Sequence, residues 1–204
     1  YILGIAKHET AYFEARYGNA LFVPPFHRFE EPRSQAGSGH TILFHGHLGI
    51  SENSETFLSL AKHTLGRLPY AVVVAGKNPS ARFQKKLLGY ENIRLVANPG
   101  DSELEELITE AHINLLFTSQ STGIKLKLLH ALFAGRHCVV NPAMVKGTGL
   151  GDLCTVADSA EALEAHLHRL MKQPFNPAQI QERKKALKRY SNRASAEMIL
   201  RIMA

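Results

Sequence analysis

The feature that most constrains the fold is a repeated alternation of short apolar segments with segments of helical period. The apolar segments span 40–46, 70–76, 92–97, 113–118, 137–140 and 153–157. Between them, apolar residues recur at helical spacing over 51–68, 79–88, 101–111, 123–134 and 159–171. The strand segments are continuously apolar rather than alternating, so we expect each strand to be buried on both faces. The sequence therefore predicts an α/β fold with a doubly wound, parallel, Rossmann-like sheet of about six strands.

The residues before this alternation have a different character. They predict a strand over 1–7, a helix over 8–17 and a strand over 20–23, followed by turn-forming and small polar residues. We therefore predict a separate segment over 1–26, a linker over 27–39 and the main domain, with its C-terminal helices, over 40–204. The chain opens on Tyr1 rather than methionine, from which we expect a piece of a longer protein.

The strongest signal for a ligand follows the fourth strand of the main domain. Small polar residues lead there into a helix predicted to begin at Gly123. The free backbone N–H groups and the dipole at a helix start favour an anion. Lys125 and Lys127 in the first turn would oppose that dipole, and a bound diphosphate would resolve the conflict. The alternative interpretation is a pair of solvated lysines on an amphipathic helix.

Two other loops lie where a parallel sheet binds its ligands, beyond the carboxyl ends of the strands. Gly76 would allow close approach of a ligand and Lys77 would reach a phosphate, although the segment also fits a simple strand–helix turn. Gly46 and His47 offer similar access to a sugar or phosphate. His45 shares the face of His47, but no third ligand is placed by spacing, so we predict no metal site. No Gly-x-Gly-x-x-Gly follows the first strand, which argues against a dinucleotide enzyme.

The net charge of +6 arises largely from a cluster of basic residues in the tail. The cluster comprises Arg183, Lys184, Lys185, Lys188, Arg189 and Arg193. A solvated helix face is one interpretation and a membrane-surface patch is the other. The sequence shows neither an aromatic platform nor a recognition helix, so we expect no nucleic-acid partner.

The two cysteines, Cys138 and Cys154, lie in apolar segments and are expected to be buried, inert thiols. They form no disulfide framework, and no apolar run approaches the roughly 20 residues that span a bilayer. We therefore expect a cytoplasmic protein, with a peripheral position on the inner face of the membrane as the alternative.

Three loops, in their order along the chain, resemble those of the C-terminal half of GT-B fold glycosyltransferases. The resemblance is to the retaining family with a Glu-x7-Glu motif, and it runs from about Ile42 to Leu170. Gly46-His47 stands where that family has Gly-Arg, and 76–79 matches its Gly-x-x-Pro. Residues 122–127 match the Thr-Gly-Ile-Lys-x-Lys form of a bacterial subset. By this resemblance, residues 1–26 would be the end of an acceptor domain with its hinge.

The resemblance also implies which residues bind a nucleotide-sugar donor. Residues 122–124 would hold its diphosphate through backbone amides, and two lysines would neutralise the charge. Residues 96–98 would meet the base through backbone contacts and His130 would lie near the ribose. No metal or cofactor would be required, because basic groups and the helix end stabilise the leaving group. The implied donor-binding residues are Gly46, His47, Lys77, Asn78, Ala97, Asn98, Thr122, Gly123, Ile124, Lys125, Lys127 and His130.

The sequence departs from the family at both motif glutamates, where Thr122 and His130 stand, and Glu52 lies near the expected place of a family lysine. We nevertheless predict transfer of a sugar from a nucleoside diphosphate to a glycan or glycolipid acceptor, with retention. The catalytic residues are left unassigned, and without the missing N-terminal domain we expect the chain to be inactive. The alternatives are a degenerate domain acting as a binding or assembly module, and a sugar-nucleotide epimerase.

Overall fold

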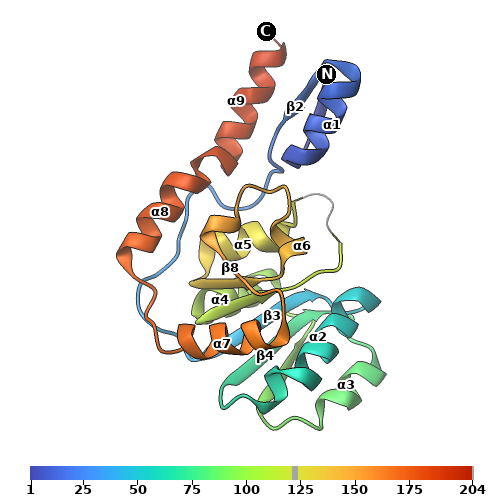
Figure 1. The fold of residues 1–204 in the computed structure, drawn as a ribbon, viewed down its shortest axis with the longest axis vertical. Coiled ribbons are helices and arrows are strands. Elements are labelled where there is room, and N and C mark those ends of the chain that lie inside the picture. Colours follow the sequence, from blue (N-terminus) through green and yellow to red (C-terminus); the bar gives the residue numbers. More distant parts are fainter. Residues whose placement is uncertain (121–123, 204) are drawn as a thin grey trace.

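The computed structural model describes residues 1–120 and 124–203, and it confirms the predicted α/β class. The described strands of the main domain pair in parallel in the order β5-β4-β3-β6-β7-β8 (Figure 1). The order reverses between β3 and β6, as it does in doubly wound sheets. The strands are β3 (Thr41–His47), β4 (Ala71–Lys77), β5 (Ile93–Ala97), β6 (Ile113–Leu116), β7 (His137–Val140) and β8 (Thr155–Val156).

Helices cover both faces of this sheet and enclose two apolar cores (Figure 1). One face is covered by α2 (Ser51–His63), α3 (Ala81–Leu87) and α7 (Ala160–Leu170). The other is covered by α4 (Asp101–Glu110), α5 (Leu126–Ala134), α6 (Pro142–Val145) and α8 (Pro177–Leu187). Successive residues of β3 point to opposite cores, Phe44 toward α2 and Leu43 toward α5. This two-sided burial is the reason that the strands read as continuous apolar runs.

Helix α5 begins at Leu126, so the prediction that it begins at Gly123 is wrong. Lys125 is its N-cap residue and has extended backbone angles, φ −81° and ψ 121°. Ile124, only 5% exposed, packs into the core under α5. Burying this side chain requires the chain to enter the core in an extended conformation before it turns into the helix.

The first residues of the chain form a two-stranded sheet that is separate from the large one. The strands β1 (Ile2–Gly4) and β2 (Ala20–Phe22) pair in parallel around α1 (Lys7–Tyr17). Residues 27–39 contain no helix or named strand, yet Phe29 is buried against Phe133. The last helix, α9 (Asn192–Met203), returns to the N-terminal segment, and both termini lie at the same end of the molecule (Figure 1). Short 3-10 turns occupy Leu65–Arg67, Gly151–Leu153 and Lys188–Tyr190.

The basic tail is only partly a solvated helix face. Arg183 is 2% exposed, which contradicts that interpretation for this residue. Its guanidinium donates to the carbonyl oxygen of Gly135 at 2.6 Å and to the hydroxyl of Ser34 at 3.0 Å. It thereby caps the carboxyl end of α5, where a cation is favoured by the helix dipole. The other five basic residues of the cluster are exposed.

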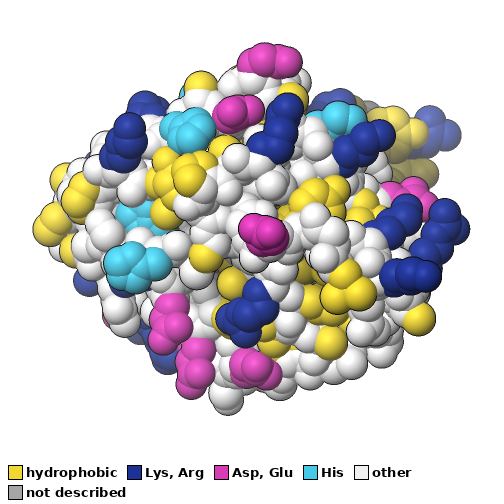
Figure 2. Space-filling view, turned by 90° about the horizontal axis from the view of Figure 1, so that it is seen from below, with side chains coloured by type: hydrophobic (Ala, Val, Ile, Leu, Met, Phe, Trp, Pro, Cys, Tyr) yellow, Lys and Arg dark blue, Asp and Glu magenta, His cyan; other side chains and the backbone are white. Residues whose placement is uncertain are grey.

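The remaining expectations concern contact with a membrane and the reactivity of the two cysteines. Figure 2 shows the face covered by α2, α3 and α7, where acidic, basic and apolar side chains are interspersed. Among the described residues, no helix has the length and apolar character to cross a membrane.

Cys138 is buried and Cys154 is partly exposed by its side-chain surface. Burial raises the pKa of both thiols, which keeps them protonated and unreactive.

Candidate functional site

The candidate site lies at the carboxyl edge of the sheet, where the strand order reverses between β3 and β6. Ligands of open α/β sheets bind in the crevice at this point. β3 ends at His47, and β6 ends at Leu116 before a short segment leads toward α5. The ends of two neighbouring strands and the amino end of a helix therefore converge at one place.

The ends of β3, β4 and β5 are joined by asparagine side chains. The backbone N–H of Asn78 donates to Oδ1 of Asn98 at 2.7 Å. The backbone N–H of Asn98 donates to the carbonyl of Gly76 at 2.8 Å. Both asparagines have left-handed backbone, with φ of 53° and 54°, a conformation that asparagine tolerates better than most residues. Nδ2 of Asn78 lies 3.4 Å from Nε2 of His47, which is exposed at the end of β3.

The glycine of the second loop is explained by strand packing. A Cβ on Gly76 would lie 1.8 Å from the carbonyl oxygen of Gly46, its partner in β3. A side chain here would force the two strands apart. The requirement for glycine at position 76 thus comes from the neighbouring strand, whereas the sequence interpretation attributed it to a ligand.

Lys127, in the first turn of α5, connects the helix to both strand ends. Its ammonium donates to the carbonyl of Phe117 at 3.2 Å and to Oδ1 of Asn53 at 3.4 Å. Asn53, in the first turn of α2, in turn donates from Nδ2 to the carbonyl of His47 at 3.1 Å. Burial lowers the pKa of Lys127, Glu52 opposes that effect and Lys125 adds to it. An ammonium has three donors, so one remains for a ligand.

Glu52 fixes the segment that follows β6. Its Oε1 accepts from the hydroxyl of Thr118 at 2.6 Å and from the backbone N–H of Ser119 at 2.7 Å. The Thr118 bond is the main reason that the pKa of Glu52 is lowered, so the carboxylate is ionised. Asn141, after β7, clamps the same segment by donating to the carbonyl of Thr118 at 2.7 Å and accepting from its N–H at 3.3 Å.

Of the predicted residues on and near α5, Thr122 and Gly123 lie outside the described residues. Lys125 is partly buried, and burial lowers its pKa against the opposing charges of Glu52 and Glu9. His130 lies one turn beyond Lys127, edge-on to the ring of Phe29 at 5.5 Å. Burial, followed by His27 and Arg28, lowers the pKa of His130 and favours the neutral imidazole.

The structure brings most of the predicted residues to one edge and adds others that sequence reasoning missed. Gly46, His47, Lys77, Asn78, Ala97 and Asn98 occupy three adjacent strand ends, and Lys125 and Lys127 lie at the amino end of α5. The missed residues are Asn53, Thr118 and Asn141, whose shared signal is a polar side chain within a few residues of a strand end. In the part of the chain that the structure describes, no three His, Cys, Asp or Glu side chains are grouped as a metal site would require.

Comparison with protein families matches residues 39–173 to the family described as glycosyl transferases group 1. No curated protein matches the chain. The matched range contains all six strands of the large sheet and the crevice described above.

Several solved structures share the fold at low sequence identity. A variant of S. aureus TarM, solved with UDP, fondaparinux and α-GlcNAc-glycerol, superposes with a TM-score of 0.72 at 10% identity, over 98% of this chain and 43% of that one. Sucrose-phosphate synthase from Thermosynechococcus elongatus gives 0.71 at 14% identity, over 98% and 57%. AviGT4, a glycosyltransferase involved in avilamycin A biosynthesis, gives 0.62 at 15% identity, over 98% and 61%. The chain thus spans roughly half the length of these structures.

Proposed function

The chain belongs to the group 1 glycosyl transferases, and from this premise we propose that it binds a nucleoside-diphosphate sugar for transfer to a glycan or glycolipid acceptor. The observation that carries the proposal is the position of Lys127. This ammonium lies on the first turn of α5, where the strand order of the sheet reverses. It is bonded directly to the carbonyl of Phe117 after β6 and, through the side chain of Asn53, to the end of β3.

A diphosphate fits the chemistry of this edge. The first backbone N–H groups of α5 have no carbonyl partner within the helix, and its dipole favours an anion there. Lys125 and Lys127 bring two cations to the same end, although cations alone would be unfavourable at a helix start. A diphosphate would reverse that penalty, and these groups would stabilise the leaving nucleoside diphosphate without a metal or another cofactor.

The remaining parts of the donor would lie on either side of the diphosphate. We assign the base to the backbone at Ala97 and Asn98, and the ribose to the vicinity of His130. Gly46, His47, Lys77 and Asn78 would face the sugar and the phosphates. These positions follow from the family resemblance, and the hydrogen-bonded strand ends give them a common edge.

The rest of the enzyme belongs to the proposal as well. We assign residues 1–26 to the end of an acceptor domain and 27–39 to the connection between the domains. The chain spans 43% of one TarM structure, so the full catalytic apparatus would be shared with a further domain and this chain alone would not transfer sugar. The exposed lysines of α8 suit a peripheral contact with an anionic membrane at the inner face.

One observation favours a second function, that of a non-catalytic binding module. The ionised carboxylate of Glu52 is held beside the same crevice by Thr118 and Ser119. A fixed negative charge there would weaken the binding of a diphosphate. On this alternative the domain keeps its fold and serves in assembly.

Calorimetry on the protein distinguishes the two functions. We expect UDP or GDP to bind the unmodified protein, and Lys127→Met to weaken that binding about 10- to 100-fold, as expected for loss of a charge-assisted hydrogen bond. Lys62→Met, at an exposed position in the last turn of α2, is the matched control and should bind as the unmodified protein does. The donor function is refuted if neither nucleotide nor its sugar conjugate binds the unmodified protein.

A further inference from the structure

His45 is a buried side chain whose ring nitrogen Nε2 has no hydrogen-bond partner among the residues that the structure describes. The residue lies in β3 and is 3% exposed. An unbonded polar atom in a protein interior costs free energy, so native proteins keep few of them. This free-energy cost requires an explanation, and functional sites are the places where unbonded buried polar atoms are expected.

The other buried atoms without a partner belong to side chains that are otherwise bonded. Asn92 donates from Nδ2 to three backbone carbonyls, and Asn114 donates to the carbonyl of Ile108. Arg136 donates from Nη1 to the carbonyls that end α4. In each of these three side chains, another atom makes hydrogen bonds that hold the group in place and leave one atom unpaired. Among the described residues, no such hydrogen bond accounts for the unpaired Nε2 of His45.

The position of His45 places its ring beneath the proposed diphosphate site. Alternation along β3 puts it on the same face as Leu43, which packs in the core that α5 covers. Lys127 and His130, three residues apart on one side of α5, are the two charged or titratable groups that act on its imidazole. The ring therefore lies between the strand and the first turns of the helix.

We propose that His45 is a donor-binding residue, whose Nε2–H donates to a phosphoryl oxygen of a nucleoside diphosphate held at the amino end of α5. The inference rests on the proposed function and adds to it a neutral donor that approaches from beneath the crevice. The bonds from Lys127 to Phe117 and Asn53, at 3.2 Å and 3.4 Å, are long for charged donors.

The electrostatic state of His45 agrees with this role. Burial above all, with Lys127 and His130 adding to it, lowers the pKa of His45 from 6.5 to about 3. The imidazole is therefore neutral at pH 7 and retains one N–H. A dianionic ligand would select the tautomer that carries this hydrogen on Nε2.

The test separates a ligand role from a structural one, because the two predict different effects of His45→Leu. Since Nε2 has no partner to lose, this variant should unfold at the same temperature as the unmodified protein or a higher one. Its affinity for UDP or GDP, and for inorganic pyrophosphate as the minimal probe, should fall about 10- to 100-fold, the loss expected for one hydrogen bond to a charged group. Unchanged affinity for pyrophosphate would overturn the inference and leave the proposed function standing.

A second measurement covers the case in which His45→Leu also loses stability. The imidazole nitrogen resonances of the unmodified protein are followed by NMR as pyrophosphate is added. We expect Nε2 of His45 to shift, while the buried His112, which is bonded to Gly39 and Leu170 at the other end of the sheet, stays unchanged. Absence of a shift at His45 in protein that binds pyrophosphate refutes the inference, and protein that binds no probe at all refutes the proposed function with it.

Discussion

A buried histidine lies near each edge of the sheet, and the two histidines differ in their hydrogen bonds. At the amino edge, His112 bonds the backbone of Gly39 and Leu170 through its two ring nitrogens, and Arg183 bonds the carbonyls that end α5. At the carboxyl edge, Nε2 of His45 has no partner and the bonds of Lys127 are long. His112 at the amino edge therefore helps to hold the fold, whereas His45 at the carboxyl edge is left to bind a ligand.

The geometry of α5 connects the two edges. Its carboxyl end is capped by Arg183, and its amino end carries Lys125 and Lys127. A cation at the carboxyl end is favourable, whereas cations at the amino end are unfavourable until an anion arrives. The carboxyl end of α5 is thus stabilised within the protein, whereas the amino end is stabilised only when a ligand binds. Substitutions at the carboxyl end should therefore change the free energy of unfolding, and substitutions at the amino end should change the affinity for the ligand.

The largest effect is expected from Arg183→Met. This substitution removes the donors to Gly135, Arg136 and Ser34 and leaves buried carbonyls without partners. We expect the free energy of unfolding, measured with urea, to fall by about 3 kcal/mol. Lys185→Met on the same helix is the control, because Lys185 is exposed, and it should change stability by less than about 0.5 kcal/mol. Equal effects of the two substitutions would mean that the amino edge does not hold the fold.

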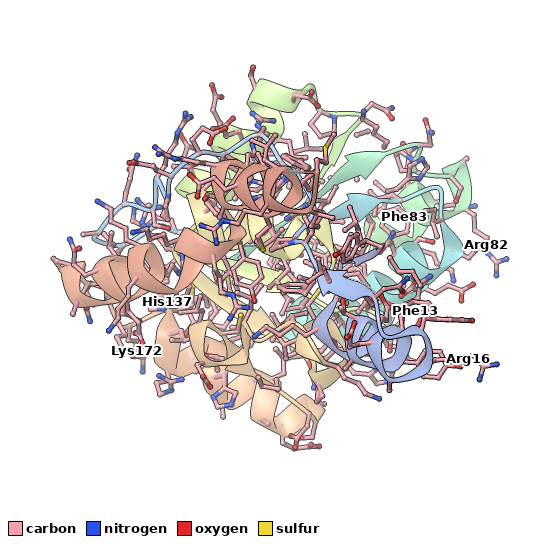
Figure 3. All side chains as sticks on the ribbon, turned by 90° about the horizontal axis from the view of Figure 1, so that it is seen from above. Phe13, Arg16, Arg82, Phe83, His137 and Lys172 are labelled. Carbon is pink, nitrogen blue, oxygen red and sulfur yellow. The ribbon has the colours of Figure 1, made fainter. Side chains whose placement is uncertain are left out.

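Lowering the pH should destabilise the amino edge of the sheet, because His137 becomes protonated on unfolding. Figure 3 shows this residue near Lys172, on the side of the molecule away from Arg82 and Phe83. Burial lowers the pKa of His137 from 6.5 to about 4, against the opposing hydrogen bond to Gln173. Between these pH values the unfolded chain binds more protons than the folded one, so stability falls as the pH falls through this window.

The loss from this one histidine should reach about 3 kcal/mol near pH 4. Urea unfolding at pH 7 and pH 4.5 measures it, and His137→Gln should reduce the difference between the two pH values by about 2 kcal/mol. His40→Gln, at an exposed position, should leave that difference as it is in the unmodified protein. A pH dependence that is undiminished in His137→Gln would assign the acid sensitivity to other groups, of which His45 is the first candidate.

These contrasts also show what the sequence could predict. The strands were predictable because two-sided burial leaves a continuous apolar run, and β7 occupies 137–140 as predicted. The start of α5 was not predictable, because the burial of Ile124 in the tertiary structure overrides the local helical pattern. Arg183 was grouped with the exposed tail, since nothing local distinguishes a basic side chain that reaches the end of a distant helix.

The candidate site was predictable to a similar extent. The loops after the parallel strands placed most of the predicted residues at the one edge where the structure brings them together, and the spacing placed His45 and His47 on one face. It could not show that His45 is covered by α5 while His47 lies in the open. Nor could it find Asn53 as the link between the strand end and Lys127, because that link exists only once two separate helices meet the sheet.

Lys127→Met offers a sharper test of the carboxyl edge, where ligand binding and stability should separate. The lysine is partly buried and its two hydrogen bonds are long, so their loss is offset by the smaller cost of burying an uncharged side chain. We expect the free energy of unfolding in urea to change by less than about 1 kcal/mol, although nucleotide binding is weakened about 10- to 100-fold. A loss of stability as large as that of Arg183→Met would remove the distinction between the two edges.

The smallest effect concerns the left-handed asparagines of the carboxyl edge. Asn78→Gly relieves the backbone at φ 53° and gives up only the 3.4 Å contact with His47, so we expect stability to rise by about 0.5 kcal/mol. Asn98→Gly relieves a similar φ of 54° but removes the oxygen that accepts the N–H of Asn78, so it should be the less stable variant by about 1 kcal/mol. Urea unfolding of both variants gives the difference directly. If Asn78→Gly is instead destabilised as much as Asn98→Gly, the side chain of Asn78 holds this edge together in the absence of a ligand, and the contrast between the edges is weaker than the hydrogen bonds indicate.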